Sequence, residues 1–500
     1  MARFRTQVTE GASPLQTLGG LFHDVVYYQP DGGLTQAQWE LVNSPTRAID
    51  VHDDDRVTVG ASAGGALDGE GGAAGAHSSE EGGDGGIADS AGLVGDSDPM
   101  LQMVAGVFGL EAGQEISVTT GQNEFLSAVI CARCLAPVLS MAVIAQIAAT
   151  IEMTIPFRGE GAALRLHRGL LAATARSGVP LSSAAADVAV AEAVSLGNRD
   201  VADFASEDPA VFLSNTWLLL PEGNWDLWKP NVYSTSCWRR AIGKVHGFYV
   251  GYIKPGNVFQ SHAGVPLKDE MDRLKAHSTR NITVARVYLV LKLLAAGVLE
   301  AIAVATGGDM PVAGLMGSLD LSQEGEERRK ATVGRKKPCG EARMEDFLPP
   351  SPKPLSPPEE AQGQVGDEGD VRQQLMRLVY EGRELAAPFD LKHSPLAAFL
   401  LSEMGMGSCA KALALFQEVW KAGDGELTSA SAAEALLSEA LSPRVSAVVT
   451  RACAAVADQR ENVLATLRDK LEALSSASEG GKRNAPDATT GLPNKTIPCL

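Results

Sequence analysis

The chain has 500 residues, of which 45% are hydrophobic, and it carries a formal net charge of −18. This length and composition are typical of a folded protein of about two to four domains, and the acidic balance argues against nucleic-acid binding as the main property of its surface. The seven cysteines are scattered and odd in number, which favours reduced thiols over a disulfide framework.

The first part of the chain divides by composition. Residues 1–49 form a mixed segment that begins without the apolar run of a secretory leader. Residues 50–98 consist mostly of Gly, Ala, Ser, Asp and Glu, and Arg56 is the one basic residue among them. Such a segment buries too little apolar surface to offset the entropy of ordering it. We therefore predict a disordered, Gly-rich acidic insertion at 50–98.

Residues 99–321 form the predicted main domain, which opens with strongly apolar sequence. The pattern from Asn123 to Met153 is a long helix, apolar on all sides and interrupted near Pro137. A helix of this kind is buried on all sides. Because its most apolar part is short for a bilayer and contains a proline, we predict a core helix and no membrane span.

Four further helical patterns follow in this domain, at 161–178, 182–197, 265–277 and 282–306. Ser182 or Ser183 suits the N-cap position of the second, because a serine hydroxyl can accept a bond from the first free backbone N–H groups. The helix at 282–306 is almost wholly apolar, so we expect it to be a second core helix.

Aromatic residues, only 5% of the chain, are concentrated between residues 211 and 264. Large aromatic side chains dominate core and interface energetics because each removes so much apolar surface from water. Trp217 lies in the apolar run NTWLLLP and is expected in the core. Trp225 and Trp228 lie in PEGNWDLWKPN, where two prolines and a glycine predict a loop.

The tryptophans of this predicted loop have no helix or strand period that would turn both inward. We therefore predict that Trp225 and Trp228 anchor a contact between subunits, since interfaces favour tryptophan. Tyr233, Tyr249 and Tyr252 of the same stretch are predicted to take part in this interface.

The last third of the chain has three predicted parts. Residues 322–370 are a charged and Pro-rich linker, for which an extended chain is expected. Residues 371–475 form a separate helical unit with five helices, and residues 476–500 are a disordered tail. The last helix begins at Ser442 and Pro443, and its apolar stripe comprises Val449, Cys453, Val456, Val463, Leu467, Leu471 and Leu474.

One motif suggests an enzyme. Residues 60–64, Gly-Ala-Ser-Ala-Gly, follow a strand-like run and match the nucleophile elbow of serine hydrolases, with Ser62 as the nucleophile. The motif is similar to the serine box of hormone-sensitive-lipase-like esterases. The Gly-rich sequence that follows cannot form the required helix, however, and no oxyanion donor loop precedes it. A serine esterase therefore stays an alternative, and we predict that the chain is not an enzyme.

Other candidate sites have simpler explanations. Cys131 and Cys134 have redox or zinc spacing but lie in an apolar helix, which favours two buried thiols. The acidic run 52–55 lacks the glycine turn of a calcium loop. No nucleophile or carboxylate lies at a sequence spacing from His246, His262 or His277 that would indicate a catalytic site. The basic clusters 328–330 and 335–337 are flanked by acidic residues, which favours a flexible segment of mixed charge. We predict no metal and no cofactor.

Residues 100–320 resemble the capsid proteins of totivirus-like double-stranded RNA viruses, the victorivirus and leishmaniavirus group. The resemblance rests on the segments EDPAVFLSNTWLLLP (207–221), WKPNV (228–232), HGFYVGYIKPGNVF (246–259), AGVPLKDEMDRL (263–274) and ARVYLVLKLLAAGVLEAIA (285–303). It is a similarity in the composition of these segments and in their order along the chain, together with an Ala-, Gly- and Pro-rich C-terminal third.

This resemblance implies an α+β, predominantly helical, elongated capsid subunit with Gly-rich and Pro-rich disordered segments. It also implies a dimer-based shell that encloses double-stranded RNA, without sequence-specific binding, and the viral RNA-dependent RNA polymerase. The expected location is the virion and the host cytoplasm, with no membrane partner. The alternative to a viral protein is a soluble helical scaffold or adaptor protein with disordered linkers.

Overall fold

The computed structural model describes residues 11–44, 49–52, 56–60, 98–156, 158–229, 232–316, 344, 347–348, 368–423 and 425–481. Within these residues the chain is predominantly helical, so this part of the predicted fold class is confirmed. Ser62, both basic clusters and most of the predicted insertion and linker lie outside the described residues, as does the tail from 482 onward.

The first half of the chain contains α2 (Pro14–Phe22), α3 (Tyr28–Asp31), α4 (Gln36–Val42), β1 (Ile49–Val51), β2 (Val57–Val59), α5 (Pro99–Phe108), β3 (Glu115–Ile116), η1 (Val118–Thr120), α6 (Gln122–Leu135), α7 (Met141–Glu152), α8 (Ala162–Arg176) and α9 (Ser183–Asp200). The second half contains η2 (Ala202–Ala205), α10 (Pro209–Leu218), α11 (Leu220–Gly223), η3 (Trp225–Trp228), α12 (Thr235–Gly251), η4 (Pro255–Asn257), α13 (Lys268–Ala305), α14 (Ala313–Met316), α16 (Glu368–Tyr380), α17 (Pro395–Ala422), α18 (Ala430–Ala440) and α19 (Pro443–Gly481).

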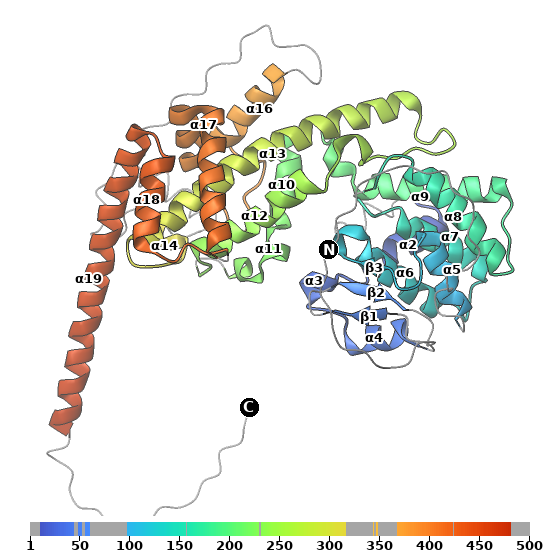
Figure 1. Cartoon of the computed structure of the whole chain (residues 1–500), viewed down its shortest axis with the longest axis horizontal. Helices are drawn as coiled ribbons and strands as arrows, with labels where there is room; N and C mark the ends of the chain where they lie inside the picture. The colour runs from blue at the N-terminus through green and yellow to red at the C-terminus, as the bar shows by residue number, and fades with distance from the viewer. Residues whose placement is uncertain are drawn as a thin grey trace, which may run out of the picture.

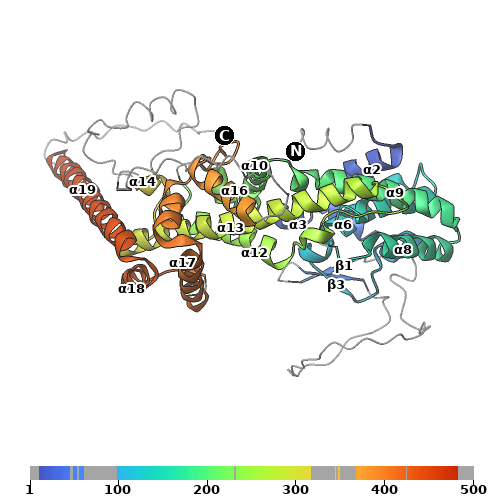
Figure 2. The ribbon, with the colours of Figure 1, turned by 90° about the horizontal axis from the view of Figure 1, so that it is seen from above.

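Buried apolar side chains form two large cores, which divide the described chain near residue 200. One core draws on residues from Val26 to Val194, and the other on residues from Val201 to Val456. We call these parts the N-terminal body (11–200) and the C-terminal body (201–481). The two bodies lie side by side along the long axis of the molecule (Figure 1), and the view from above in Figure 2 agrees.

The N-terminal body is built around α7, which contacts α2, α5, α6, α8 and α9. The predicted break in the long apolar pattern is confirmed: α6 ends at Leu135 and α7 begins at Met141, with Pro137 between them. Ser182 caps α9 as predicted, since its side chain accepts a hydrogen bond from the Ala185 N–H.

A small antiparallel sheet, in the order β1-β2-β3, covers part of this body. Ile49, Val57, Val59 and Ile116 are buried, so one face of the sheet joins the core. Two of these strands fall in the first residues of the predicted insertion 50–98, and that prediction is wrong for residues 50–51 and 57–59. The prediction rests on the composition of the whole segment, in which two short apolar strands among many acidic and glycine residues carry little weight.

His23 joins the end of α2 to the end of α9. Its ring is buried, with Nε2 3.2 Å from Asp24 Oδ2 and 3.3 Å from Asp200 Oδ1, and Nδ1 2.9 Å from the Gly20 carbonyl oxygen. Burial disfavours the charged ring, but the hydrogen bonds and charges of Asp200 and Asp24 outweigh it and raise the pKa of His23 to about 11. The imidazolium donates from both nitrogens in this arrangement.

The C-terminal body is built around α13, a single helix of 38 residues against which α12, α16, α17, α18 and α19 pack. The sequence predicts two helices here, at 265–277 and 282–306. They are continuous because 278–281 contain no glycine or proline. The junction is also held against the preceding segment, since Asn281 Nδ2 donates to the carbonyls of Phe204 and Ser206, at 3.0 and 2.8 Å.

The predicted helical unit at 371–475 is not separate from the main domain. Its helices share one core with α13, and Phe416 and Trp420 of α17 cross it at Gly297, where a Cβ would lie 2.9 Å from either ring. A small residue is needed for this close approach. Its described residues form four helices, and a sharp turn at Gly405 (φ 72°) splits α17 into two segments, which gives the five predicted.

By length and composition alone, α13 and α17 could each cross a membrane. In α13, however, 89% of the apolar window is buried by other described parts of the chain, which is the behaviour of a core helix. In α17 the buried share is 33%.

Candidate assembly surfaces

Trp217 lies in the core, as predicted. It is wholly buried on α10, its ring packs edge-on against Tyr288 of α13 at 5.6 Å between centroids, and its Nε1 donates to Asp390 Oδ2 at 2.7 Å. The tryptophan therefore joins α10 to α13 and to the loop before α17.

A buried polar cluster surrounds this tryptophan. The carboxylate of Asp390 lies 3.0 Å from Lys292 Nζ and 3.4 Å from Arg383 Nη1. Arg383 also stacks over the Trp217 ring at 4.3 Å, and Lys292 lies over the Trp238 ring at 4.8 Å. One carboxylate thus pairs with two buried cations, each of which also lies against an indole ring. These contacts hold α10, α13 and the loop before α17 together.

Trp225 and Trp228, by contrast, are exposed, at 55% and 51%. The predicted loop consists of two short helical turns, α11 and η3. In a 3₁₀ turn, residues three apart lie one above the other, so both indoles occupy one side of η3. Leu227 is buried and anchors the turn, and Asn224 caps it by accepting a hydrogen bond from the Asp226 N–H. We call these two side chains the tryptophan patch.

The tyrosines predicted for the interface lie elsewhere. Tyr233 and Tyr249 are buried, so their prediction as interface residues is wrong. The Tyr233 hydroxyl donates to the Phe389 carbonyl, and the Tyr249 hydroxyl lies 2.9 Å from Thr216 Oγ1. Burial raises the pKa of both phenols well above the ordinary range. Tyr252 is 47% exposed at the end of α12, whereas η3 packs near the start of that helix.

The last helix carries a second exposed apolar surface. Its predicted stripe is confirmed in the first half, where Val449 and Val456 are buried in the core. Further along, Val463, Leu464, Leu467 and Leu471 are all exposed. Leu464, Leu467 and Leu471 have the spacing of an a/d seam. In both views the second half of α19 extends beyond the other described helices (Figure 1, Figure 2). We call these four residues the α19 stripe.

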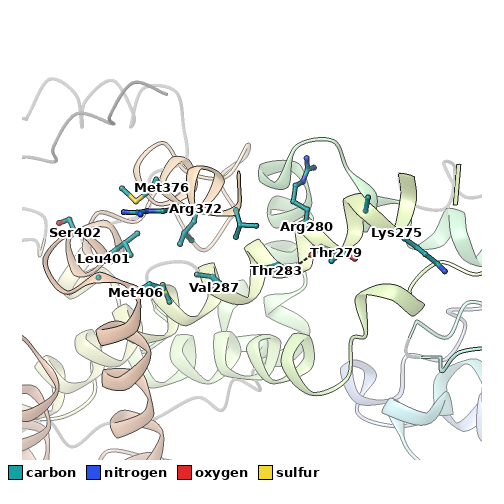
Figure 3. Close-up of a pocket in the computed structure, with 14 residues that line it drawn as sticks. Lys275, Thr279, Arg280, Thr283, Val287, Arg372, Met376, Leu401, Ser402 and Met406 are labelled. Atoms are coloured by element: carbon teal, nitrogen blue, oxygen red, sulfur yellow. Dashed lines mark hydrogen bonds between the residues drawn. The ribbon is translucent and has the colours of Figure 1, made fainter. Parts of the chain in front are cut away.

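A groove of about 1140 Å³ lies between α13, α16 and α17 (Figure 3). Apolar side chains, among them Val287, Leu375 and Leu401, line it together with exposed Lys275 and Arg372. The positive φ of Gly405 turns the α17 backbone along one wall. Such a lining fits an apolar segment that carries acidic side chains.

The remaining candidates are dispersed. Cys131 is buried on α6 but Cys134 is exposed, so they do not share a buried face. Burial lowers the pKa of His246, and His277 Nδ1 lies 3.3 Å from the Ala205 carbonyl oxygen. His262 does have a carboxylate beside it, which the sequence does not reveal: Asp187 Oδ1 lies 2.9 Å from its Nε2.

Comparisons with protein-family models, curated proteins and solved structures found no match to this chain. Its function is therefore inferred from the surfaces described above and from the sequence.

Proposed function

We propose that this chain is a structural protein that assembles with copies of itself into a closed shell, the capsid of a totivirus-like double-stranded RNA virus. The observation that carries the proposal is the tryptophan patch, in which Trp225 and Trp228 are each about half exposed on one side of η3. The resemblance of residues 100–320 supplies the type of shell.

The physical case starts from the cost of exposing indole rings to water. A buried tryptophan removes about 150–250 Å² from solvent, and truncating one at the centre of an interface typically costs about 2–4 kcal/mol. A rigid turn fixed by Leu227 and Asn224 presents both rings without further ordering. Burial against another subunit would use this preorganised surface.

The α19 stripe supports assembly beyond a dimer. The helix that carries it, α19, lies on the far side of the C-terminal body from the N-terminal body in Figure 1. A subunit with two distinct self-association surfaces can form closed or extended assemblies, whereas a single twofold contact stops at the dimer. The net charge of −18 also suits a shell whose enclosed RNA must stay mobile, since acidic walls do not adsorb phosphates.

The proposal includes the partners that the resemblance implies. These are further copies of the chain in a dimer-based shell, an enclosed polymerase and double-stranded RNA held without sequence-specific contacts. The corresponding location is the virion in the host cytoplasm, and no catalytic activity is included.

Negative-stain electron microscopy of the expressed full chain tests this function. Closed particles of uniform diameter are expected, and they should sediment far ahead of the 52.3 kDa monomer. A homogeneous monomer or small oligomer at every accessible concentration would contradict a shell.

One observation favours a second function, that of a helical adaptor. The groove between α13, α16 and α17 could hold an apolar helix of a partner, in the manner of helix-in-groove recognition. If the chain is an adaptor, negative-stain electron microscopy should show small oligomers and no closed particles.

A further inference from the structure

We propose that His167, Asp187 and His262 form a binding site for a divalent transition-metal ion, for which Zn²⁺ is the best fit. One ligand atom from each of these residues lies within 4.8 Å of the other two. This site is separate from the surfaces proposed for assembly, and it does not depend on the shell function.

The three side chains come from distant parts of the sequence. His167 lies in the middle of α8, Asp187 in the second turn of α9, and His262 in the loop between η4 and α13. Contacts between α8 and α9 set the first two beside each other. The loop is fixed by paired backbone hydrogen bonds between His262 and Val265, at 3.0 and 2.9 Å.

A second anchor holds this loop against α9. Asn198 Nδ2 donates to the Gln260 carbonyl at 2.9 Å, and the Gln260 N–H donates back to Asn198 Oδ1 at 3.0 Å. The position of His262, two residues later, is therefore set by backbone contacts and does not depend on the contact of its own ring with Asp187.

The distances suit one ion held by all three groups. Asp187 Oδ1 lies 2.9 Å from His262 Nε2 and 3.2 Å from His167 Nε2, and the two imidazole rings are 5.4 Å apart between centroids. In a tetrahedral zinc site with bonds of about 2.0–2.1 Å, neighbouring ligand atoms are about 3.3 Å apart. The two oxygen–nitrogen distances of the cluster are already close to this spacing, and its ligand atoms all lie within 4.8 Å of one another.

The hydrogen bonding supplies an independent indication. His167 Nε2 is buried and makes no hydrogen bond within the described part of the chain, although it lies 3.2 Å from Asp187 Oδ1. A buried ring nitrogen whose neighbouring carboxylate is poorly oriented for a hydrogen bond gains little to offset the cost of its burial. A metal ion between the two imidazoles and the carboxylate would satisfy this nitrogen together with His262 Nε2.

The ligand types decide the class of ion. Two imidazoles and one carboxylate favour zinc and its neighbours over calcium or magnesium, which prefer oxygen ligands only. Three protein ligands leave a fourth position for water. Asp187 has 43% of its side chain exposed, so solvent reaches the cluster beside this carboxylate.

The ion would link the two bodies of the molecule. His167 and Asp187 belong to the N-terminal body, whereas the loop of His262 belongs to the C-terminal body, whose core includes nearby Val258 and Phe259. Because a ligand that binds only the folded arrangement stabilises it, bound zinc should raise the temperature at which the bodies separate and unfold.

Isothermal titration of the full chain with ZnCl₂, expressed without a histidine tag and stripped with a chelator, tests the site. We expect one saturable zinc per chain and a zinc-dependent rise in Tm. Asp187→Asn, at a partly exposed position, and His167→Gln should each weaken binding by about tenfold or more and remove most of the rise in Tm.

His246→Gln is the matched control, because it removes a half-buried histidine outside the cluster. It should bind zinc as the parent does. The proposal is overturned if the parent shows no saturable one-to-one binding, or if both cluster variants, folded by circular dichroism, bind zinc as tightly as the parent.

Discussion

Replacing Asp390 with asparagine tests how the C-terminal body is held together. Asp390 is the carboxylate that faces Lys292 Nζ at 3.0 Å and Arg383 Nη1 at 3.4 Å, and all three side chains are at least nine-tenths buried. The amide can still accept the hydrogen bond from Trp217, so the substitution removes the charge and leaves the volume. Two buried cations then lack a counter-charge.

The expected cost follows from this geometry. Breaking a buried, hydrogen-bonded ion pair by removing one partner typically costs about 3–5 kcal/mol. Asp226→Asn is the matched control, since its ion pair with Lys229, at 3.2 Å, joins side chains that are 53% and 68% exposed. An exposed pair of this kind contributes about 0–1 kcal/mol.

Urea unfolding followed by tryptophan fluorescence is the appropriate assay. Of the six tryptophans, only Trp39 lies outside the C-terminal body, so the signal reports mainly on that body. The midpoint of the Asp390→Asn variant should fall at an unchanged slope, by the equivalent of about 3–5 kcal/mol. A loss below about 1 kcal/mol, or no difference from the Asp226→Asn control, would refute the role assigned to the cluster.

Three further outcomes are expected. The folded-state pKa of His23, about 11, lies above its ordinary value of 6.5, so the stability that charged His23 contributes is complete below pH 6.5 and is lost as the pH rises toward 11. His23→Gln should therefore flatten the decline of Tm over this range. An unchanged slope of Tm against pH would contradict the raised pKa of His23. Gly197→Ala should destabilise the N-terminal body, because the added Cβ would lie 2.4 Å from the Met153 carbonyl oxygen. The control Gly247→Ala, with open space around it, should raise Tm slightly. Equal effects of the two variants in a thermal melt would count against the close packing of α7 and α9. Leu467→Glu, at a position 49% exposed, should reduce assembly measured by light scattering at unchanged Tm, and a lowered Tm would mean that the α19 stripe is packed within the subunit.

The sequence predicts the helices well where their pattern is local. The break at Pro137, the Ser182 cap and the start of α19 after Ser442 follow from residues close together in the chain, and the structure has all three. The sequence does not predict which helices share a core. No local feature shows that 371–475 packs around α13, since that depends on shape at crossings such as Gly297.

The candidate surfaces show the same limit. Trp225 and Trp228 are exposed as the proline-flanked sequence predicts, but Tyr233 and Tyr249 of the same stretch are buried by partners far away in sequence, such as Phe389. The histidine cluster has no motif spacing at all. Asp187 lies 75 residues from His262, so only the folding of the chain brings the two together.

Sedimentation velocity of the parent chain beside the Trp225→Ala/Trp228→Ala double variant tests self-assembly through the tryptophan patch most directly. The parent should sediment as a large assembly and the double variant as a smaller species with an unchanged Tm, since losing two anchors at about 2–4 kcal/mol each lowers the association constant at least about a thousandfold. Leu164→Ala, an exposed apolar position on α8, should assemble as the parent does. A double variant that sediments like the parent, or one that no longer folds, would contradict the account.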